Sequence, residues 1–355
     1  MRIIKKLPLF LLGALLLITL VSCDSGGNKR IEESLFALDT YITFTVSSGR
    51  GQDSRTGLDL AIQRIQEVEQ RMSVSIADSD ISKINAAAGK EAVKVNSDTF
   101  YVIQKAVQYG ELTQGNFDIS ILPIVKLWDI YSDNPRIPDV KEVEQILPLV
   151  DYKKIILDEQ EQTVFLEKEG MSIDLGGIAK GYVGDEVVRI LKEHGVSNAL
   201  INLGGNIAVI NGKEDGSPWR IGIQNPRLED DSEKRGHVAA VPTTGNSIVT
   251  SGDYERYIVE VFQQTGERYH HIFDTATGYP AQNVVISVTI VTESGIDADV
   301  LSTALFVIGV EEGLKLANEL DGIEAMIITE DKAIYLSEGL KDQISSVHSD
   351  YHIVE

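Results

Sequence analysis

The segment Met171-Ser-Ile-Asp-Leu-Gly-Gly-Ile-Ala-Lys-Gly-Tyr182 places an apolar strand directly before a double glycine and a helix that would begin near Ile178. Gly176 and Gly177 permit positive φ and close approach of the backbone. The unpaired amides and the positive dipole of the helix would face an anion such as a phosphate, and Lys180 would add a full positive charge. The alternative is an ordinary strand-to-helix connection with a solvated lysine, because a glycine-rich turn alone is a weak signal.

Hydrophobic periodicity on both sides of this segment predicts a mixture of helices and strands. Asp139 and Glu142 have the spacing of a capping box at the start of a short helix that Pro148 ends. Longer helices are predicted over residues 58–72, 98–112, 178–193, 297–307 and 311–320, and further strands over residues 41–46, 154–157, 163–166, 199–203 and 284–291. Interspersed hairpins and helices favour an α+β fold built on mainly antiparallel sheets.

The N-terminus has the features of an export signal. Residues 1–6 are basic, and the apolar run over residues 7–21 is shorter than the roughly 20 residues that cross a bilayer. Leu20-Val-Ser-Cys23 resembles the lipobox of bacterial lipoproteins, which implies cleavage before Cys23 and acylation of that residue. We therefore expect a lipid-anchored protein on the extracytoplasmic face of the cell membrane.

This interpretation divides the chain into three parts. Residues 1–22 are the signal peptide, residues 23–30 are the lipidated cysteine with a short flexible tether, and residues 31–355 form the folded domain. Cys23 is the only cysteine, so the domain has no intramolecular disulfide and depends on its hydrophobic core.

Composition excludes one large class of partners. The chain is 43% hydrophobic and 24% charged, as globular proteins are, and its formal net charge is −22. Binding to nucleic acid needs a basic face, which this sequence does not supply. An acidic protein that binds a phosphate ester has to overcome repulsion locally, and a divalent cation is the simplest means.

Asp299 and Thr303 are the candidate ligands for such a cation. They stand four residues apart at the start of an apolar helix, hence on one face, and both offer the oxygen atoms that Mg²⁺ prefers. Each residue also has a plainer interpretation. Thr303 can bond back to the carbonyl of Asp299, and Asp299 can be an acid that favours a helix N-terminus.

Several short motifs, taken in order, resemble the FAD:protein FMN transferases, also known as ApbE-like flavin-trafficking lipoproteins. The resemblance covers nearly the whole mature chain. The motifs are Met72-Ser73, residues 78–85, Gly115-Asn-Phe-Asp118, Asp174-Leu-Gly-Gly-Ile-Ala-Lys-Gly-Tyr182, Asn202-Leu-Gly-Gly-Asn206, Thr250-Ser-Gly252, residues 271–280 and residues 297–303. Members of this family bind FAD with Mg²⁺ and transfer FMN to a threonine hydroxyl of partner proteins, such as membrane redox-pump subunits, releasing AMP. Their fold resembles the tunnelling fold, with the flavin in a central cleft.

The resemblance also implies roles for individual residues. Asp299, Thr303 and the carbonyl of Ala179 would hold Mg²⁺ at the FAD pyrophosphate, with support from Lys180, and His271 would be the general base for the threonine hydroxyl. His270 is the alternative base, but only His271 matches the family's pattern. The other residues implied to contact FAD are Met72, Phe117, Asp118, Trp128, Asp174, Gly176, Gly177, Gly204, Gly205, Ser251 and Gly252. Met72, Phe117 and Trp128 are equally well explained as core residues.

The chain departs from the family at two places. Ser75 and Ala77 stand where an aromatic residue and a proline are common, which predicts weaker stacking on the flavin, and Thr275 replaces a proline after Asp274, which predicts a looser turn. These departures leave open an enzyme that hydrolyses FAD to FMN and AMP. A flavin-binding or storage lipoprotein is the third alternative, since storage requires neither His271 nor a metal.

Overall fold

The computed structural model describes residues 29–48, 53–130, 132–227, 236–345 and 347–354. The predicted signal peptide over residues 1–22 and the predicted lipidation site Cys23 lie outside the described residues. Strand β1 begins at Lys29, so Lys29 and Arg30 belong to the first strand and not to the predicted tether. Within the described ranges, no helix has both the length and the apolar character needed to span a bilayer.

Helices and strands alternate irregularly along the chain. Their order is β1 (Lys29–Ala37), β2 (Thr40–Ser48), α1 (Ser54–Met72), α2 (Asp80–Ala87), β3 (Val93–Lys94), α3 (Ser97–Leu112), η1 (Ile119–Ile121), α4 (Leu122–Trp128), α5 (Val140–Ile146), η2 (Leu147–Leu149), η3 (Tyr152–Lys154), β4 (Ile155–Asp158), β5 (Thr163–Leu166), α6 (Ala179–Glu193), β6 (Asn198–Leu203), β7 (Asn206–Ile210), β8 (Trp219–Gln224), β9 (His237–Thr243), β10 (Ser247–Gly252), α7 (Val259–Thr265), β11 (Val285–Thr292), α8 (Gly295–Ile308), α9 (Val310–Glu319), β12 (Glu324–Thr329), β13 (Ala333–Leu336), η4 (Glu338–Leu340) and β14 (His352–Ile353).

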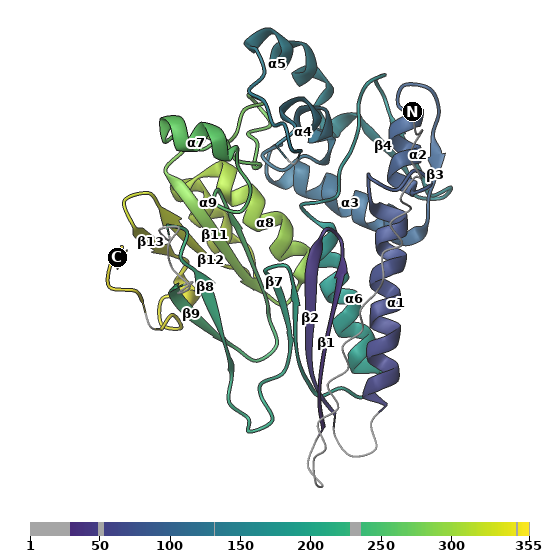
Figure 1. Cartoon of the computed structure of the whole chain (residues 1–355). Helices are drawn as coiled ribbons and strands as arrows, with labels where there is room; N and C mark the ends of the chain where they lie inside the picture. The colour runs from purple at the N-terminus through teal and green to yellow at the C-terminus, as the bar shows by residue number, and fades with distance from the viewer. Residues whose placement is uncertain (1–28, 49–52, 131, 228–235, 346, 355) are drawn as a thin grey trace, which may run out of the picture.

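A nine-stranded sheet in the order β1-β2-β6-β7-β10-β11-β12-β13-β14 forms the frame of the molecule (Figure 1). Its neighbouring strands pair antiparallel, apart from the parallel pair β13 and β14. Two small antiparallel sheets, β3-β5-β4 and β8-β9, complete the described strands. This arrangement confirms the prediction of an α+β fold on mainly antiparallel sheets.

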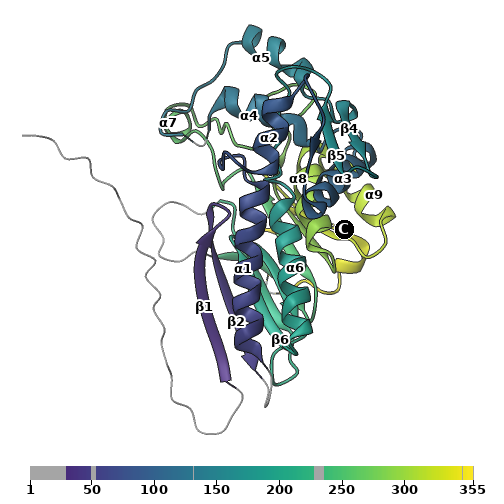
Figure 2. The same ribbon diagram turned by 90° about the vertical axis from the view of Figure 1, so that its right-hand side faces the viewer.

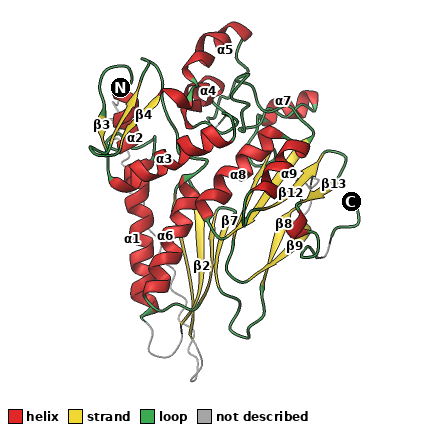
Figure 3. Ribbon diagram, turned by 180° about the vertical axis from the view of Figure 1, so that it is seen from behind, coloured by secondary structure: helices red, strands yellow, loops and turns green. Residues whose placement is uncertain are grey.

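Helices cover one face of the large sheet, and the β8–β9 hairpin covers part of the other. Figures 2 and 3 show α1 and α6 side by side against the strands, with α8 next to α6, and the largest apolar cluster lies between these helices and the sheet. A second cluster joins the hairpin to the opposite face of β10 to β13. All eight residues of β11 are consequently buried, which explains the continuous apolar run in its sequence.

Most of the predicted elements are confirmed, but the predicted strand before the double glycine is wrong. Residues 171–175, all of them described, are extended and belong to no sheet. The side-chain amide of Asn85 takes the place of a neighbouring strand: its Oδ1 accepts from the amide of Ile173 at 2.7 Å, and its Nδ2 donates to the carbonyl of Ile173 at 3.0 Å. A hydrophobic pattern reports an extended buried segment, but it does not report whether a strand or a side chain satisfies the backbone.

Two glycines allow α6 and α8 to touch backbone to backbone. A Cβ atom on Gly181 would lie 2.1 Å from the carbonyl oxygen of Gly295, and a Cβ atom on Gly295 would lie 2.6 Å from the carbonyl oxygen of Gly181. Backbone carbonyls in two packed helices cannot move aside as a flexible side chain can, so any larger residue forces the helices apart. The crossing fixes the relation between the first turns of α6 and α8.

We expect Gly181→Ala to destabilise the protein by about 1–3 kcal/mol, because the added methyl group overlaps the α8 backbone. Gly184→Ala on the same helix is the matched control. Its Cβ would meet Ala208 and Leu203 at 3.6 Å, an ordinary contact, and its higher helix propensity should leave stability unchanged or raise it by about 0.5–1 kcal/mol. Urea unfolding of the purified proteins measures both, and equal stability of the two variants would contradict the steric account of the crossing.

Candidate active site

Asp299 is a buried carboxylate at the crossing of α6 and α8. It is 4% exposed. Its Oδ2 accepts a hydrogen bond from the amide of Gly181 at 2.9 Å, and its Oδ1 accepts one from Nδ2 of Asn206, also at 2.9 Å. Gly181 lies in the first turn of α6, so the positive end of that helix faces the carboxylate. These two donors and the helix dipole offset the cost of burying the charge.

In this structure, the anion at the start of α6 is the carboxylate of Asp299, whereas the sequence analysis predicted a phosphate there. The amides of Ile178 and Ala179 donate to the carbonyl of Leu175 at 3.0 and 2.8 Å, and that of Gly181 donates to Asp299. Three of the amides expected to face a phosphate thus have acceptors within the protein. Lys180 turns back along the helix, with Nζ 3.0 Å from the carbonyl oxygen of Gly176.

The double glycine provides space and not an unusual backbone conformation. The positive φ that glycine permits is found at neither Gly176 nor Gly177, both within the described residues. A Cβ atom on Gly177 would instead lie 3.2 Å from Cε2 of Phe117 and 3.9 Å from Oγ1 of Thr303. Gly177 thus brings the loop against both Phe117 and α8.

Hydroxyl groups lie one turn along α8 from Asp299. Oγ1 of Thr303 is 3.3 Å from Oγ of Ser251, and Ser251 is 2.8 Å from Oγ of Ser302, which donates to the carbonyl of Asp299 at 2.9 Å. The contact from Thr303 to the same carbonyl measures 3.5 Å, so the plainer interpretation of Thr303 rests on a weak hydrogen bond. Ser251 and Thr303 form a hydroxyl pair between β10 and α8.

These residues fit a hard cation. Asp299 and Thr303 supply a carboxylate and a hydroxyl, and Ala179 begins the helix whose first turn packs against Asp299. Each carboxylate oxygen accepts one N–H bond and retains lone-pair capacity for a metal. Across the described ranges, His, Cys, Asp and Glu side chains form no cluster of three or more that could hold a metal. The donor set is thus one carboxylate with neutral oxygens, suited to an ion that keeps waters or substrate oxygens in its shell.

His271 is held in one tautomer by the backbone. Its Nδ1 lies 3.2 Å from the carbonyl oxygen of Arg256, which also accepts the amide of His271 at 3.1 Å. A carbonyl only accepts, so Nδ1 carries the proton and the neutral ring has its lone pair on Nε2. Burial lowers the pKa of His271 to about 3, and the nearby charges of Arg256 and Lys180 act in the same direction, while the hydrogen bond to the Arg256 carbonyl opposes the shift.

His270 has a structural position instead. It is buried, its Nε2 lies 3.1 Å from the carbonyl of Ala281, and its Nδ1 accepts from the amide of Ile272 at 3.2 Å. Both ring nitrogens are therefore engaged within the protein, and burial lowers the pKa of this imidazole as well.

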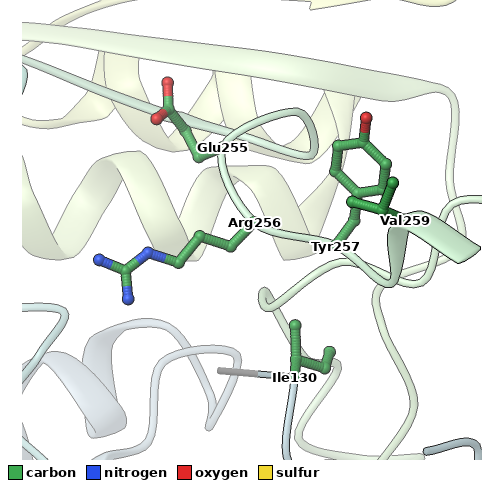
Figure 4. A pocket seen from close by; sticks show the side chains of 5 residues that line it. All are labelled: Ile130, Glu255, Arg256, Tyr257 and Val259. Atoms are coloured by element: carbon green, nitrogen blue, oxygen red, sulfur yellow. The ribbon is translucent and has the colours of Figure 1, made fainter. Parts of the chain in front are cut away.

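A surface hollow of about 340 Å³ lies beside the residue that orients His271. Its lining consists of Ile130, Glu255, Arg256, Tyr257 and Val259. Figure 4 shows the Arg256 side chain extending away from Tyr257 and Val259. A much smaller cavity of about 10 Å³, the room for a single water, lies between α6 and β7 and includes Gly181 and Asn206 in its lining.

Asp118 supports a loop. Its Oδ1 accepts from the amide and the hydroxyl of Ser120 at 2.8 and 2.6 Å, and its Oδ2 accepts from the amide of Tyr152 at 2.7 Å. Burial raises the pKa of this carboxyl group. The carboxylate of Asp118, which the resemblance predicts to contact FAD, is buried and accepts these three protein hydrogen bonds. It fixes the path of the chain just after Phe117.

The predicted apolar contacts for the flavin lie in the core. Trp128 is 0% exposed, stacks on Tyr269 and donates from Nε1 to the carbonyl of Gly278 at 2.9 Å, as a core residue does. Phe117 and Met72 are also buried. Phe117 contacts the Gly177 loop, whereas Met72 is the last residue of α1.

The turn at 274–279 is well tied, contrary to the prediction from Thr275. Two hydrogen bonds of 2.8 Å close the turn: the amide of Asp274 donates to the carbonyl of Tyr279, and the amide of Gly278 donates to the carbonyl of Asp274. Thr275 Oγ1 donates to the carbonyl of Gly115 at 2.6 Å. A proline at this position could not form that bond, so Thr275 adds a tether between two of the motifs. Ser75, at the other departure from the family, lies exposed in the loop after α1.

The remaining predicted residues line the loops around this centre. Asp174 accepts from the amide of Gly176 at 2.9 Å, and burial raises the pKa of Asp174 while Lys180 opposes that shift. Gly204 and Gly205 both have positive φ, and a Cβ atom on Gly204 would lie 2.0 Å from Oγ1 of Thr40. Gly252 ends β10, where a Cβ atom would meet the ring of Tyr254.

Sequence reasoning missed three polar residues that shape the site. Asn206 holds Asp299, Asn85 holds the segment before Asp174, and Asp185 caps the start of α8. The two asparagines lie inside motifs already singled out, so their position was a usable signal. Asp185 lies outside the quoted motifs, four residues after Gly181.

Fold and site together define an α+β protein with an oxygen-rich site at a helix crossing. The chain belongs to the ApbE family, whose model matches residues 38–327. A Klebsiella pneumoniae (strain 342) protein named FAD:protein FMN transferase is 36% identical over 293 residues, covering 82% of this chain and 88% of that protein. One of the same name from Treponema pallidum (strain Nichols) is 32% identical over 351 residues, covering 94% of each.

Solved structures agree with this assignment. The crystal structure of the ApbE protein from Thermotoga maritima is similar at a TM-score of 0.80 and 33% identity, covering 90% of this chain and all of that one. The flavin transferase ApbE from Vibrio cholerae is similar at a TM-score of 0.76 and 27% identity, covering 89% of this chain and 100% of its own. The predicted family and fold class are therefore confirmed.

We expect the imidazole of His271 to stay neutral from pH 8 down to pH 5, because its pKa is lowered to about 3. In the unfolded chain the pKa is about 6.5, so the unfolded state takes up the proton first as pH falls. Stability from this group is complete above about pH 6.5 and is lost as pH falls toward about 3. Its NMR Cε1–H shift should therefore be flat from pH 8 to pH 5.

His271→Asn, whose amide can still donate to the Arg256 carbonyl, identifies the resonance. Between pH 7 and pH 5 the parent protein should lose unfolding free energy through His271. The His271→Asn variant should lose less, by on the order of 1 kcal/mol. A titration midpoint near pH 6.5 in the parent protein would show that the ring is not desolvated.

Proposed function

We propose that this protein is an FAD:protein FMN transferase that moves FMN from FAD to a threonine hydroxyl of a partner protein and releases AMP. Membership of the family supports the flavin transferase activity. The observation that carries the proposal is the buried Asp299 carboxylate, held by Gly181 and Asn206 beside the hydroxyl pair of Ser251 and Thr303. Such a centre suits a phosphoanhydride that reaches the protein with a cation.

Asp299, Thr303 and the carbonyl of Ala179 would hold Mg²⁺. When bound, the ion neutralises charge on the pyrophosphate of FAD and on the departing phosphate of AMP. Side chains of this protein would supply the other contributions. Lys180 lies in the first turn of α6 beside the same centre, and its ammonium group can add positive charge there when it leaves the carbonyl of Gly176.

The transfer forms one bond and breaks another. The threonine oxygen attacks the phosphorus on the FMN side of the pyrophosphate, the bond from that phosphorus to the bridging oxygen breaks, and the electron pair leaves with AMP. The threonine proton goes to Nε2 of His271, whose other nitrogen is held by the Arg256 carbonyl. The imidazole is neutral at pH 7 and can accept this proton, but a pKa of about 3 makes it a weaker base than an imidazole that titrates near pH 7.

Water in place of threonine would give FMN and AMP, so hydrolysis of FAD remains the alternative reaction of the same centre. The direct test incubates the purified protein with FAD, Mg²⁺ and a peptide that carries a flavinylation threonine. Transfer predicts a covalent FMN adduct on that threonine, detected by mass spectrometry, with AMP in equal amount. AMP without the adduct would show a hydrolase. If neither AMP nor the adduct forms, flavin storage is the alternative that remains.

We expect His271→Asn to slow FMN transfer by about 10²- to 10⁴-fold, the usual contribution of a general base, with nearly unchanged FAD affinity. His237→Asn is the matched control, because His237 is exposed at the start of β9 in the separate two-stranded sheet. Adduct formation followed over time, together with FAD binding by calorimetry, separates chemistry from binding. Transfer at the parental rate in His271→Asn would eliminate this residue as the base.

We also propose that the protein is anchored by lipid on Cys23 at the extracytoplasmic face of the cell membrane, where its acceptors would be membrane redox-pump subunits or similar proteins. The lipobox-like sequence before Cys23 supports this location. Cys23→Ser should move the protein from the membrane fraction to the soluble fraction or block its processing. A processed Cys23→Ser protein that still sediments with membranes would exclude lipid as the anchor.

A further inference from the structure

The first turns of α6 and α8 are related by a reciprocal pattern of glycine and aspartate. Gly181 on α6 is followed four residues later by Asp185, and Gly295 on α8 is followed four residues later by Asp299. The two glycines meet at the helix crossing. Residues four apart lie on one face of a helix, so each helix presents a glycine and a carboxylate to the other.

Each carboxylate caps the other helix. Asp299 Oδ2 accepts from the amide of Gly181 in the first turn of α6 at 2.9 Å. Asp185 Oδ1 accepts from the amide of Gly295 at 2.6 Å, and its Oδ2 accepts from the amide of Ile296 at 3.0 Å, both in the first turn of α8. The two helices are therefore held together by three charge-assisted bonds around one backbone contact.

We propose that Asp185 is a positioning residue that sets Asp299 in place for the metal. Asp185 makes no bond to Asp299 itself; it holds the first turn of α8 against α6, and Asp299 follows one turn later on the same helix. A shift of the α8 start would alter where the Asp299 carboxylate stands relative to the start of α6 and the carbonyl of Ala179. The role rests on the proposed function, because it presumes that Asp299 is a metal ligand.

The fit around Asp185 is tight, so its length as well as its charge has an effect. A Cβ atom on Gly295 would lie 2.9 Å from Oδ1 of Asp185. Ser294, the N-cap of α8, accepts separately from the amide of Asp297 at 3.3 Å. The start of α8 thus has a local cap from Ser294 and a long-range cap from Asp185, and only the second connects it to α6.

The test measures metal affinity directly. Mn²⁺, which accepts the same oxygen ligands as Mg²⁺, is titrated into the purified protein in the presence of FAD and without acceptor, and free Mn²⁺ is followed by electron paramagnetic resonance. Asp185→Asn keeps the shape but replaces an acceptor by a donor opposite a backbone N–H. We expect the Mn²⁺ dissociation constant to rise about 10- to 100-fold, the usual effect of losing a group that orients a ligand.

Ser294→Ala is the matched control. It removes the local cap of the same helix and should lower the unfolding temperature, yet it leaves the link to α6 intact and should leave Mn²⁺ affinity at the parental value. Thr303→Val serves as the ligand control and should weaken Mn²⁺ binding. It is preferred to replacement of Asp299, which would leave the amide of Gly181 and Nδ2 of Asn206 buried without an acceptor.

Parental Mn²⁺ affinity in Asp185→Asn would overturn the proposal, as would an equal loss of affinity in Ser294→Ala, which would attribute the effect to helix stability. If Asp185→Asn does not fold, Asp185→Glu decides the question, because the longer carboxylate has to displace the start of α8. Reduced affinity then supports the role of Asp185, and parental affinity refutes it. If the parent protein does not bind Mn²⁺, the metal site of the proposed function is overturned as well. This outcome is distinct from failure of the Asp185 proposal alone, because it is observed in the unsubstituted protein.

Discussion

The contact between the α6 and α8 backbones is the constraint on which the site depends. Gly181 and Gly295 have no side chains, so the amides at the start of each helix come within reach of a carboxylate on the other. A residue of any greater size at either position would separate the helices and leave buried amides and carboxylates without partners, at a cost of about 1–3 kcal/mol for each unpaired group. The same two glycines are therefore required both for the close packing of the helices and for the hydrogen bonds to the two carboxylates.

Burial of Asp299 in a strongly acidic protein also follows from this contact. With a formal net charge of −22, the chain has no general attraction for a phosphate ester, and an isolated buried carboxylate would favour its neutral form. The amide of Gly181 and the side chain of Asn206 donate hydrogen bonds to the carboxylate, and the positive end of the α6 dipole faces it. In the proposed function, the carboxylate would attract a cation, whose charge would compensate for the repulsion of the FAD phosphates.

Periodicity in the sequence predicted most helices and strands, because each depends on local spacing. Asp139 and Glu142 do form the expected capping box. What the sequence did not reveal are partners far apart in the chain: Asp299 lies 118 residues from Gly181 and 93 from Asn206. The failure at residues 171–175 has the same origin, since the backbone of Ile173 is satisfied by the side chain of Asn85, 88 residues away. Nothing in the local pattern distinguishes that arrangement from a strand.

The two adjacent histidines show why residue type alone could not assign a role. Burial lowers the pKa of both imidazoles, so charge does not separate them. Their backbone partners differ: the ring of His270 contacts the carbonyl of Ala281 and the amide of Ile272, whereas Nδ1 of His271 contacts the carbonyl of Arg256. Because that carbonyl fixes the tautomer through the backbone, the orientation of the base is independent of the Arg256 side chain.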